Sequence, residues 1–344
     1  MRALVTGAGG FLGRHVVSTL VDRGIEVRAM VRPAATLEGL EWSEQVEILR
    51  ADLRDQRALV GAFDGVDVLV HLAAVADGSD DFVFASTVTG TERLLAAMSG
   101  TGCRHLVLIS SLSVYDWSSI GGTLDEDSPL EVAPHLYLRD GYAIAKAWQE
   151  RVVRRAAEED GFELTVLRPG FLWGRDHAHV AAMGMSLGSL HLVVGPLTRI
   201  PMTYVENCAD LIGLTVTDGR ARGRTFNVVD GPGERVWSQL GRYLRGTGRR
   251  GIRVPIPYRL AFALVRIARA TFFRKSTNLP QILFPVRFEA RLKPLRFTNR
   301  RVRDRLGWEP PFDLRASLAR TFPAVGAPGL DGSPAVEPLL SPDA

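Results

Sequence analysis

A tyrosine and a lysine stand four residues apart in the segment GYAIAK, at Tyr142 and Lys146. In a helix this spacing places both side chains on one face. A phenol, whose pKa is ordinarily about 10, exchanges protons poorly at neutral pH, but a nearby ammonium favours the phenolate. The chain has only three lysines, and a planar guanidinium would not replace the compact ammonium in this role. The pair therefore predicts acid–base chemistry on a helix that runs to roughly Gly161.

Three serines stand at the end of the strand-like run HLVLIS and just beyond it, at Ser110, Ser111 and Ser113. The carboxyl ends of parallel strands form the edge at which open α/β sheets bind ligands. Residues 116–140 follow without a regular pattern, and a loop of this length in a compact domain is usually functional. We therefore expect the reactive groups at this edge of a sheet.

A glycine-rich turn, TGAGGFLG, follows the first apolar run and precedes an amphipathic segment. Gly7, Gly10 and Gly13 at this place match the dinucleotide fingerprint, because glycines let the backbone approach a pyrophosphate at the N-terminus of a helix. The turn predicts an NAD(P) site that also includes Phe11 and Leu12. The alternative is a tight strand-to-helix turn without a ligand.

Cofactor preference is predicted from Arg32, which ends the second strand-like run where an NAD site would place an acidic residue. Arginine could bind a 2′-phosphate in bidentate fashion, which favours NADP. Alternatively, Arg32 stacks on the adenine or points to solvent in an NAD enzyme. Further cofactor contacts are expected at the ends of the third and fourth strand-like runs. Asp52 would accept a hydrogen bond from the adenine amino group, and the full set is Asp52, Leu53, Leu72, Ala73 and Ala74.

The elements that must position these residues alternate between β-branched runs and helix-period segments, the pattern of βαβ units. This predicts an α/β, doubly wound parallel sheet of the Rossmann type with a smaller C-terminal substrate-binding domain. We expect the dinucleotide domain at 1–170, joined by part of 200–235, the substrate domain mainly at 171–322, and a disordered tail at 323–344. The six predicted strands are 2–7, 26–32, 46–52, 67–73, 105–110 and 164–169.

Composition narrows the class of protein further. Two cysteines are too few for a disulfide framework, and no group of His and Cys residues has the spacing of a metal site, so we expect neither. The early first strand leaves no room for a signal peptide and no apolar run could span a bilayer, so we expect a cytoplasmic protein. The histidines of the substrate loop are expected to be ordinary loop residues rather than ligands, and they are His177, His179 and His191.

Positive charge is concentrated in residues 242–305, which hold 18 lysines and arginines against two acidic residues, although the net charge is +4. This block could attract a phosphate-bearing ligand, an acidic partner or an anionic membrane, or form a solvated face. No nucleic-acid-binding module accompanies it. The helix-like stretch 258–275 carries Arg259, Arg266, Arg269 and Arg274 on one side, so it is expected either to pack its apolar face inward or to contact a membrane peripherally.

Taken in order, TGAGGFLG, DLRD, HLAA, ISSLSVY, YAIAK and LRPGFLWG resemble the extended short-chain dehydrogenase/reductase family, and MTYVENCADLI and RDRLGWEPPFDLRASLART are similar to its later signatures. The resemblance extends to about residue 322. It implies that Ser111, Tyr142 and Lys146 are the catalytic residues and that Pro169 contacts the cofactor. It also implies a homodimer and a small-molecule substrate.

The resemblance implies hydride transfer between NADP(H) and a ketone or secondary alcohol, with Tyr142 as the general acid. The RPGFLWG segment is similar to the 3β-hydroxysteroid dehydrogenase and dihydroflavonol reductase branch, which favours a hydrophobic ketone. A nucleotide-sugar 4-epimerase or reductase with tightly bound NAD is the alternative, and a non-catalytic dinucleotide sensor is a third. Two departures stand out: Thr87 replaces an asparagine of many relatives, and Leu112 and Ser113 replace the Asp-Glu pair of dehydratases.

Overall fold

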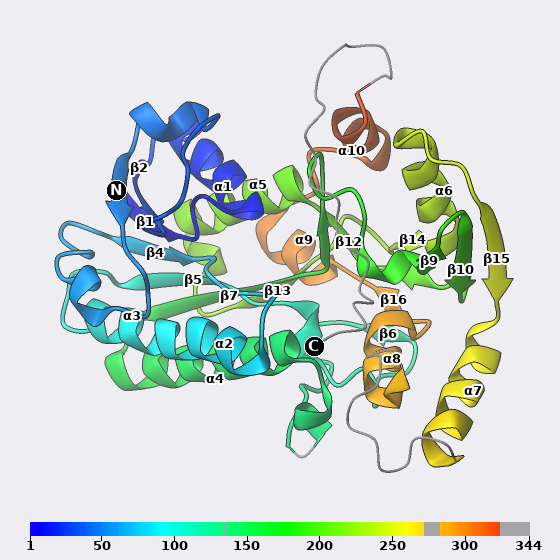
Figure 1. Ribbon diagram of the computed structural model, residues 1–344. Coiled ribbons are helices and arrows are strands. Elements are labelled where there is room, and N and C mark those ends of the chain that lie inside the picture. Colours follow the sequence, from blue (N-terminus) through cyan, green and yellow to red (C-terminus); the bar gives the residue numbers. More distant parts are fainter. Residues whose placement is uncertain (134, 272–282, 324–344) are drawn as a thin grey trace.

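A parallel sheet forms the centre of the protein in the computed structural model, which describes residues 1–133, 135–271 and 283–323 (Figure 1). Within these residues the sheet has seven strands in the order β13-β7-β5-β4-β1-β2-β3, and all neighbours are parallel. The strands are β1 (Arg2–Thr6), β2 (Glu26–Val31), β3 (Glu47–Arg50), β4 (Val68–His71), β5 (His105–Ile109), β7 (Glu163–Pro169) and β13 (Thr225–Val228). The Rossmann-type fold class is confirmed.

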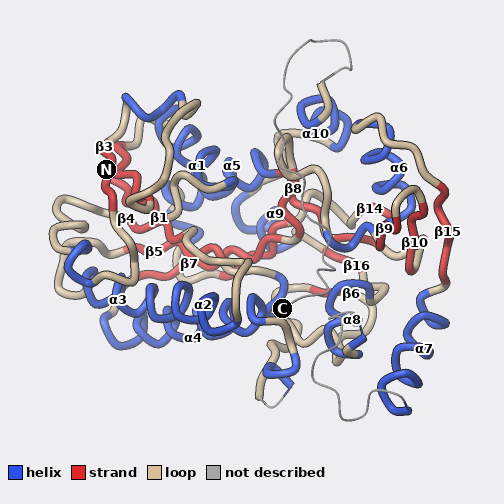
Figure 2. Tube along the Cα trace, in the orientation of Figure 1, coloured by secondary structure: helices blue, strands red, loops and turns tan. Residues whose placement is uncertain are grey.

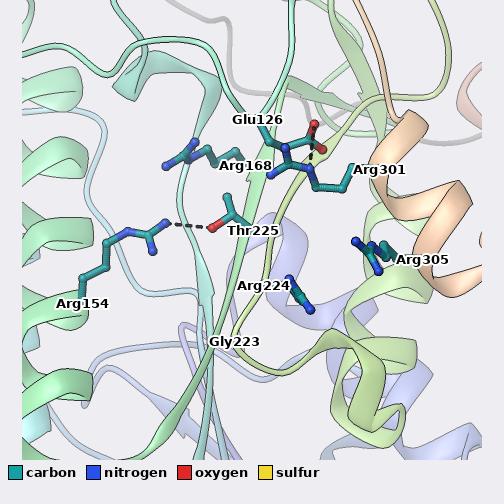
Figure 3. Close-up of a pocket in the computed structure, with 8 residues that line it drawn as sticks. All are labelled: Glu126, Arg154, Arg168, Gly223, Arg224, Thr225, Arg301 and Arg305. Atoms are coloured by element: carbon teal, nitrogen blue, oxygen red, sulfur yellow. Dashed lines mark hydrogen bonds and ion pairs between the residues drawn. The ribbon is translucent and has the colours of Figure 1, made fainter.

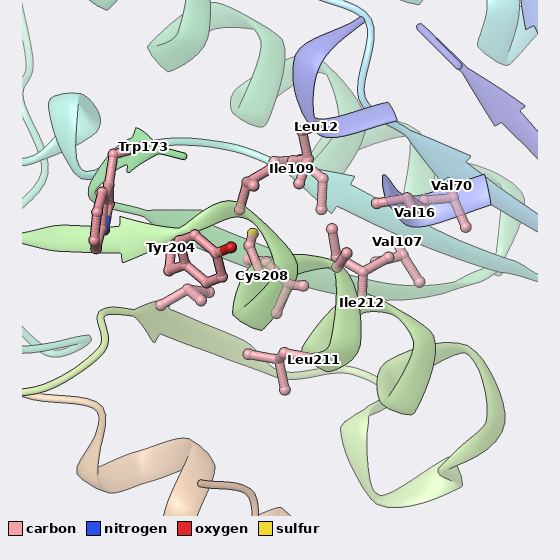
Figure 4. Packing of buried hydrophobic residues seen from close by; sticks show 14 of the residues in the cluster. Leu12, Val16, Val70, Val107, Ile109, Trp173, Tyr204, Cys208, Leu211 and Ile212 are labelled. Carbon is pink, nitrogen blue, oxygen red and sulfur yellow. The ribbon is translucent and has the colours of Figure 1, made fainter. Parts of the chain in front are cut away.

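Helices cover both faces of this sheet. On one face, α1 (Phe11–Asp22) and α5 (Val205–Thr217) pack against each other and bury an apolar core (Figure 4). On the other face lie α2 (Asp80–Phe84), α3 (Gly90–Met98) and α4 (Gly141–Asp160). Strands buried on both sides explain why their sequences read as continuous apolar runs.

The helix that carries Tyr142 and Lys146 has well-defined ends. Asp140 caps its N-terminus by accepting a hydrogen bond from the Ala143 N–H (2.9 Å). Gly161 ends it in the left-handed conformation, with φ of 71°. The predicted end of this helix at roughly Gly161 therefore agrees with the structure.

The remaining segments form smaller layers beside the carboxyl edge of the sheet (Figure 2). They contain the pairs β8 with β12, β6 with β16 and β11 with β14, and the three-stranded sheet β15-β10-β9. Their bounds are β6 (Thr123–Leu124), β8 (Phe171–Trp173), β9 (Met185–Leu187), β10 (Leu190–Val194), β11 (Arg199–Ile200), β12 (Met202–Tyr204), β14 (Glu234–Arg235), β15 (Ile252–Ile256), β16 (Arg296–Phe297), α6 (Val236–Gly246), α7 (Tyr258–Thr271), α8 (Pro285–Leu292), α9 (Arg300–Leu306) and α10 (Leu314–Thr321).

The basic helix α7 packs less completely than expected. It buries Ala261 and Val265 in a cluster with Phe288 and Leu292 of α8. Phe262 packs on the same cluster, whereas Leu260, Leu264 and Ile267 are more than half exposed. Arg274 and residues 324–344 of the expected tail lie outside the described residues, and none of the helices described is long and apolar enough to span a bilayer.

Candidate active site

The glycine loop joins β1 to α1 and leaves the N-cap of the helix exposed. Gly7 adopts φ of 70°, in the region that glycine favours, and its carbonyl accepts from the Gly10 N–H (3.0 Å). A Cβ at Gly13 would overlap that same carbonyl oxygen. The N-cap residue Gly10 is exposed and no side chain caps the helix there. The loop therefore fits a pyrophosphate, which backbone amides and the positive end of the helix dipole would hold.

The segment that follows β4 lies against this loop and is bound by the middle of α4. The Ala73 N–H donates to Thr6 Oγ1 (3.2 Å), and a Cβ at Gly7 would lie only 3.1 Å from Ala73 N. The Ala73 carbonyl accepts from Gln149 Nε2 of α4 (3.2 Å). The predicted cofactor residues of this segment are half-buried beside the loop, and they are Leu72, Ala73 and Ala74.

The predicted adenosine end holds two arginines around Asp52. Arg32 directly follows β2, and its side chain is exposed. Arg54 donates to both carboxylate oxygens of Asp52 (Nη2 to Oδ2, 2.7 Å; Nε to Oδ1, 3.1 Å), and these hydrogen bonds lower the Asp52 pKa. Leu53 packs on the start of α3, where a Cβ at Gly90 would come within 3.0 Å of it. The carboxylate expected to face the adenine is thus already paired with an arginine that the sequence did not single out.

Ser111 and Tyr142 come together from β5 and α4. Ser111 follows β5, and its Oγ accepts from the Ser113 N–H (3.1 Å). Tyr142 lies in the first turn of α4, and both side chains are half-buried. Burial raises the pKa of Tyr142, whereas its hydrogen bond with Ser111 acts in the opposite direction. Tyr142 is therefore protonated at neutral pH and suited to donate a proton.

Lys146 is buried one turn deeper, with 3% of its surface exposed. Its Nζ donates to the Ile109 carbonyl (2.6 Å), at the end of β5, and to Gln149 Oε1 (2.7 Å). Burial lowers the pKa of Lys146 to about 7, although the Glu150 charge opposes this. The charge that acts on Tyr142 is that of Asp140. The expected lowering of the tyrosine pKa by the ammonium is therefore not seen, because the lysine side chain extends past the phenol to β5.

A buried polar network that the sequence did not indicate holds the lysine. Gln149 Nε2 lies 3.1 Å from His71 Nε2 and 3.0 Å from Thr91 Oγ1. The other ring nitrogen of His71 lies 2.7 Å from Thr6 Oγ1. Burial lowers the pKa of His71 to about 3, so the ring stays neutral beside the ammonium. The helical i+3 spacing of Gln149 from Lys146 is the one signal that could have suggested this contact.

Glu150 forms a second buried centre behind the serines. It accepts from Ser110 Oγ (2.6 Å), Arg168 Nε (3.1 Å) and Arg154 Nη2 (2.8 Å). Burial alone would raise the pKa of Glu150, but the two arginines outweigh it and lower the pKa to about 2. Ser110 and Ser111 therefore have different surroundings: the first binds a structural carboxylate, the second the tyrosine.

Tyr115, four residues after Ser111, has a structural position. It is fully buried, donates to Asn227 Oδ1 (2.8 Å) and accepts from Arg168 Nη1 (2.7 Å). Pro169, the remaining predicted cofactor residue, is buried at the end of β7 and pairs with β13.

Thr87 occupies the position where many relatives have an asparagine, inside a π-helical turn at Ala85–Thr89. Its Oγ1 accepts from the Val75 N–H (3.1 Å), and its carbonyl accepts from Thr91 Oγ1 (2.6 Å). The hydroxyl thus anchors the segment that follows β4 to the helices below it.

The loop after β8 packs on the first turn of α1. His177 stacks on Phe11 with ring centroids 4.0 Å apart, and Asp176 pairs with Arg14 (2.6 Å). Leu12 is buried in the core. His177 therefore contacts a predicted cofactor residue, which its sequence context did not indicate. The other two loop histidines contact protein side chains, His179 near Tyr243 and His191 with Ser186.

Comparison with known proteins agrees with this geometry. The model of the NAD dependent epimerase/dehydratase family matches residues 3–228. A 3β-hydroxysteroid dehydrogenase/Δ5-4-isomerase of Mycobacterium tuberculosis is 29% identical over 340 residues, covering 94% of this chain and 90% of that protein. A 2-alkyl-3-oxoalkanoate reductase of Stenotrophomonas maltophilia is 32% identical over 222 residues, 61% of this chain and 63% of that protein.

Among solved structures, UDP-glucose 4-epimerase of Thermus thermophilus in complex with NAD has the same fold, with a TM-score of 0.69 and 22% identity over 94% of this chain and 98% of that one. The matched family model covers the whole Rossmann sheet, from β1 to β13. This chain therefore belongs to the NAD-dependent epimerase/dehydratase family of extended short-chain dehydrogenases/reductases, and it is an NAD(P)-dependent oxidoreductase.

Proposed function

We propose that this protein interconverts a ketone and a secondary alcohol on a hydrophobic small molecule, with NADP(H) as cofactor. The observation that carries the proposal is that the Ser111 and Tyr142 side chains come together at the carboxyl edge of the sheet, where Ser111 acts on the pKa of the tyrosine. Lys146 is linked to the segment beside the glycine loop, because Gln149 binds both the ammonium and the Ala73 carbonyl. Proton donor, buried cation and dinucleotide loop thus meet at one edge.

When bound at the glycine loop, a reduced dinucleotide would supply the hydride for reduction of a carbonyl carbon. Tyr142 gives its proton to the carbonyl oxygen, and Ser111 donates a hydrogen bond to that oxygen as negative charge develops. Lys146, whose Nζ is fixed by the Ile109 carbonyl and Gln149, would hold the ribose of the cofactor. The oxidative direction uses the same groups with the proton returning to Tyr142.

The segments that flank the first turn of α4 support a hydrophobic substrate. Tyr137 and Leu138, just before Tyr142, are 55% and 48% exposed. Phe82 and Phe84 of α2, which packs on α4, are also exposed. Exposed apolar side chains in a cluster commonly mark a binding surface. The names of the two relatives, a steroid dehydrogenase and an alkyl oxoalkanoate reductase, point to the same substrate class.

Arg32 supports NADP over NAD. Its exposed guanidinium follows β2 and acts electrostatically on Asp52, so it lies at the predicted adenosine end. Asp52 is held by Arg54 and leaves Arg32 available to a 2′-phosphate. A guanidinium–phosphate pair is charge-assisted and bidentate.

The cofactor proposal is tested by steady-state kinetics with steroid and 2-alkyl-3-oxo ketones. We expect Arg32→Ala to raise the KM for NADPH by about 10-fold or more, since a charge-assisted hydrogen bond contributes about 1.5–3 kcal/mol, and to leave the KM for NADH unchanged. An equal rise in KM for NADPH and NADH would refute the assignment of Arg32 to the 2′-phosphate. Tightly bound NAD on the purified protein, with turnover that needs no added reductant, would instead identify an epimerase.

A further inference from the structure

A cavity of about 400 Å³ opens at the free edge of the central sheet, far from the glycine loop. It lies along β13, between α4 and α9, and Figure 3 shows the side chains that line it. Because β13 stands four strands from β1 in the sheet order, the two sites are separated by roughly 19 Å at about 4.8 Å per strand. The cavity is therefore distinct from the dinucleotide site.

Arginines dominate the lining. Five arginines and one glutamate contribute, namely Arg154, Arg168, Arg224, Arg301, Arg305 and Glu126, with Thr225 and Gly223 completing the wall. Arg154 and Arg168 are compensated by Glu150 behind them. Arg301 pairs with Asp127 (2.6 Å) at the rim. The wall thus carries a clear excess of positive charge.

Two of these guanidinium groups lack a compensating partner. The side chains of Arg224 and Arg305 are exposed and have no ion pair or hydrogen bond with any other described residue. Figure 3 shows them facing the same space from β13's lead-in loop and from α9. Like charges that line one cavity repel, and an anion bound in the cavity reduces the repulsion while accepting several N–H donors. Thr225 Oγ1, which accepts from Arg154 Nη2 (2.9 Å), adds a hydroxyl on the opposite wall.

The cavity is connected to the catalytic groups through Glu150. This carboxylate binds Arg154 at the cavity and Ser110 beside the catalytic serine (2.8 and 2.6 Å). It stands one helical turn from Lys146, and its charge favours the ammonium. Arg154 is 40% exposed, so it can turn from Glu150 to a ligand, whereas Arg168 is 3% exposed and stays paired.

We propose that this cavity binds a small, multiply charged anion of the phosphate type, and that the bound anion draws Arg154 away from Glu150 and so acts on Lys146. The regulatory part rests on the proposed function, because it requires that Lys146 serves catalysis. The binding part does not.

Binding is tested by titrating inorganic pyrophosphate into the protein saturated with dinucleotide, at low ionic strength, by calorimetry with sodium chloride of equal ionic strength as the blank. We expect one site, and we expect Arg224→Ala and Arg305→Ala each to weaken binding by about 10-fold or more. Arg303→Ala is the matched control, because Arg303 is exposed on the same helix and pairs with Glu309 (3.5 Å). No binding above the chloride blank, or equal weakening by Arg303→Ala, would overturn the proposal.

Coupling is tested by the pH profile of ketone reduction with and without saturating pyrophosphate. The charged or titratable groups around Lys146 are His71 on β4, which stays neutral, and Tyr142 and Glu150 on α4. When Arg154 no longer pairs with Glu150, the carboxylate should raise the pKa of Lys146. The fall in reduction rate at alkaline pH should therefore begin about half a pH unit higher or more. Arg154→Ala should show the moved limb without pyrophosphate and no further response to it. If calorimetry shows the site filled but the alkaline side of the pH profile does not move, the coupling is overturned. Absence of any turnover would instead count against the proposed function, because the calorimetric binding test does not require turnover.

Discussion

At the scale of single residues, the site separates groups that react from groups that hold them. Ser111 and Tyr142, the proposed reacting groups, interact through their side chains and remain half-buried, so they stay accessible to a substrate. Lys146 is buried and fixed by the β5 carbonyl and by Gln149. The spacing of Tyr142 and Lys146 could be predicted from sequence because it is local. The partners of Gln149 could not, since His71, Ala73 and Thr91 lie 58 to 78 residues away in the chain.

The two adjacent serines offer a direct test of this division. Ser111→Ala should lower kcat for ketone reduction by about 100-fold or more, because it removes a donor to the developing oxyanion. Ser110→Ala should leave kcat within a few-fold but lower the free energy of unfolding by about 1.5–3 kcal/mol, because the hydroxyl donates to the buried Glu150 carboxylate. Steady-state kinetics and denaturant unfolding of both variants test this division. If Ser110→Ala lost turnover and Ser111→Ala lost stability, the roles given to the two serines would be exchanged.

The pH dependence of reduction follows from the two pKa directions. Tyr142 has a raised pKa and stays protonated, whereas Lys146 has a pKa of about 7 and is charged only below it. We therefore expect kcat/KM for reduction to be level below pH 7 and to fall by about tenfold per pH unit above it. Lys146→Arg, which stays charged, should lose this limb at a lower overall rate. A profile that is flat to pH 9 in the unsubstituted protein would contradict the assignment.

At the scale of elements, local chemistry and long-range pairing were predictable to different degrees. The glycine loop, α1 and the ends of α4 follow from glycine positions and an Asp cap, which are local signals. The stretch 116–140 has no periodicity because it is held by distant contacts, such as β6 with β16 and the Lys293 ammonium with the Trp117 carbonyl (2.8 Å). For α7, the expected apolar face was only partly right, because Leu260 and Leu264 are exposed whereas Ala261 and Val265 are buried, and sequence could not show which side α8 would cover.

The glycine loop carries its own prediction. Gly13→Ala places a methyl group on the Gly7 carbonyl oxygen, so the start of α1 must shift and dinucleotide affinity should fall by about 10-fold or more. Gly102→Ala is the matched control, because a Cβ there meets nothing within 4 Å and its backbone is not left-handed. Dinucleotide titration by tryptophan fluorescence measures both variants. Unchanged affinity in Gly13→Ala would show that the loop does not hold the pyrophosphate.

At the scale of the whole molecule, a parallel sheet brings the glycine loop, the Ala73 segment, Ser111 and Lys146 to one edge, although they lie far apart in sequence. Six strands were predicted from apolar runs. The seventh, β13, is a run of four residues between turns, and its place beside β7 depends on tertiary pairing. The domain boundaries, the homodimer, the cytoplasmic location and peripheral membrane contact stay predictions.

The measurement that tests the central claim most directly compares Tyr142→Phe with Tyr137→Phe. Both variants lose one phenolic hydroxyl, but Tyr137→Phe keeps the exposed aromatic ring, so the apolar surface proposed for the substrate stays intact. Turnover of NADPH with a hydrophobic ketone and dinucleotide affinity are measured on the same preparations. We predict that Tyr142→Phe loses at least about 100-fold in kcat with unchanged dinucleotide affinity, and that Tyr137→Phe retains turnover. Near-normal turnover in Tyr142→Phe would contradict the assignment of this tyrosine as the proton donor.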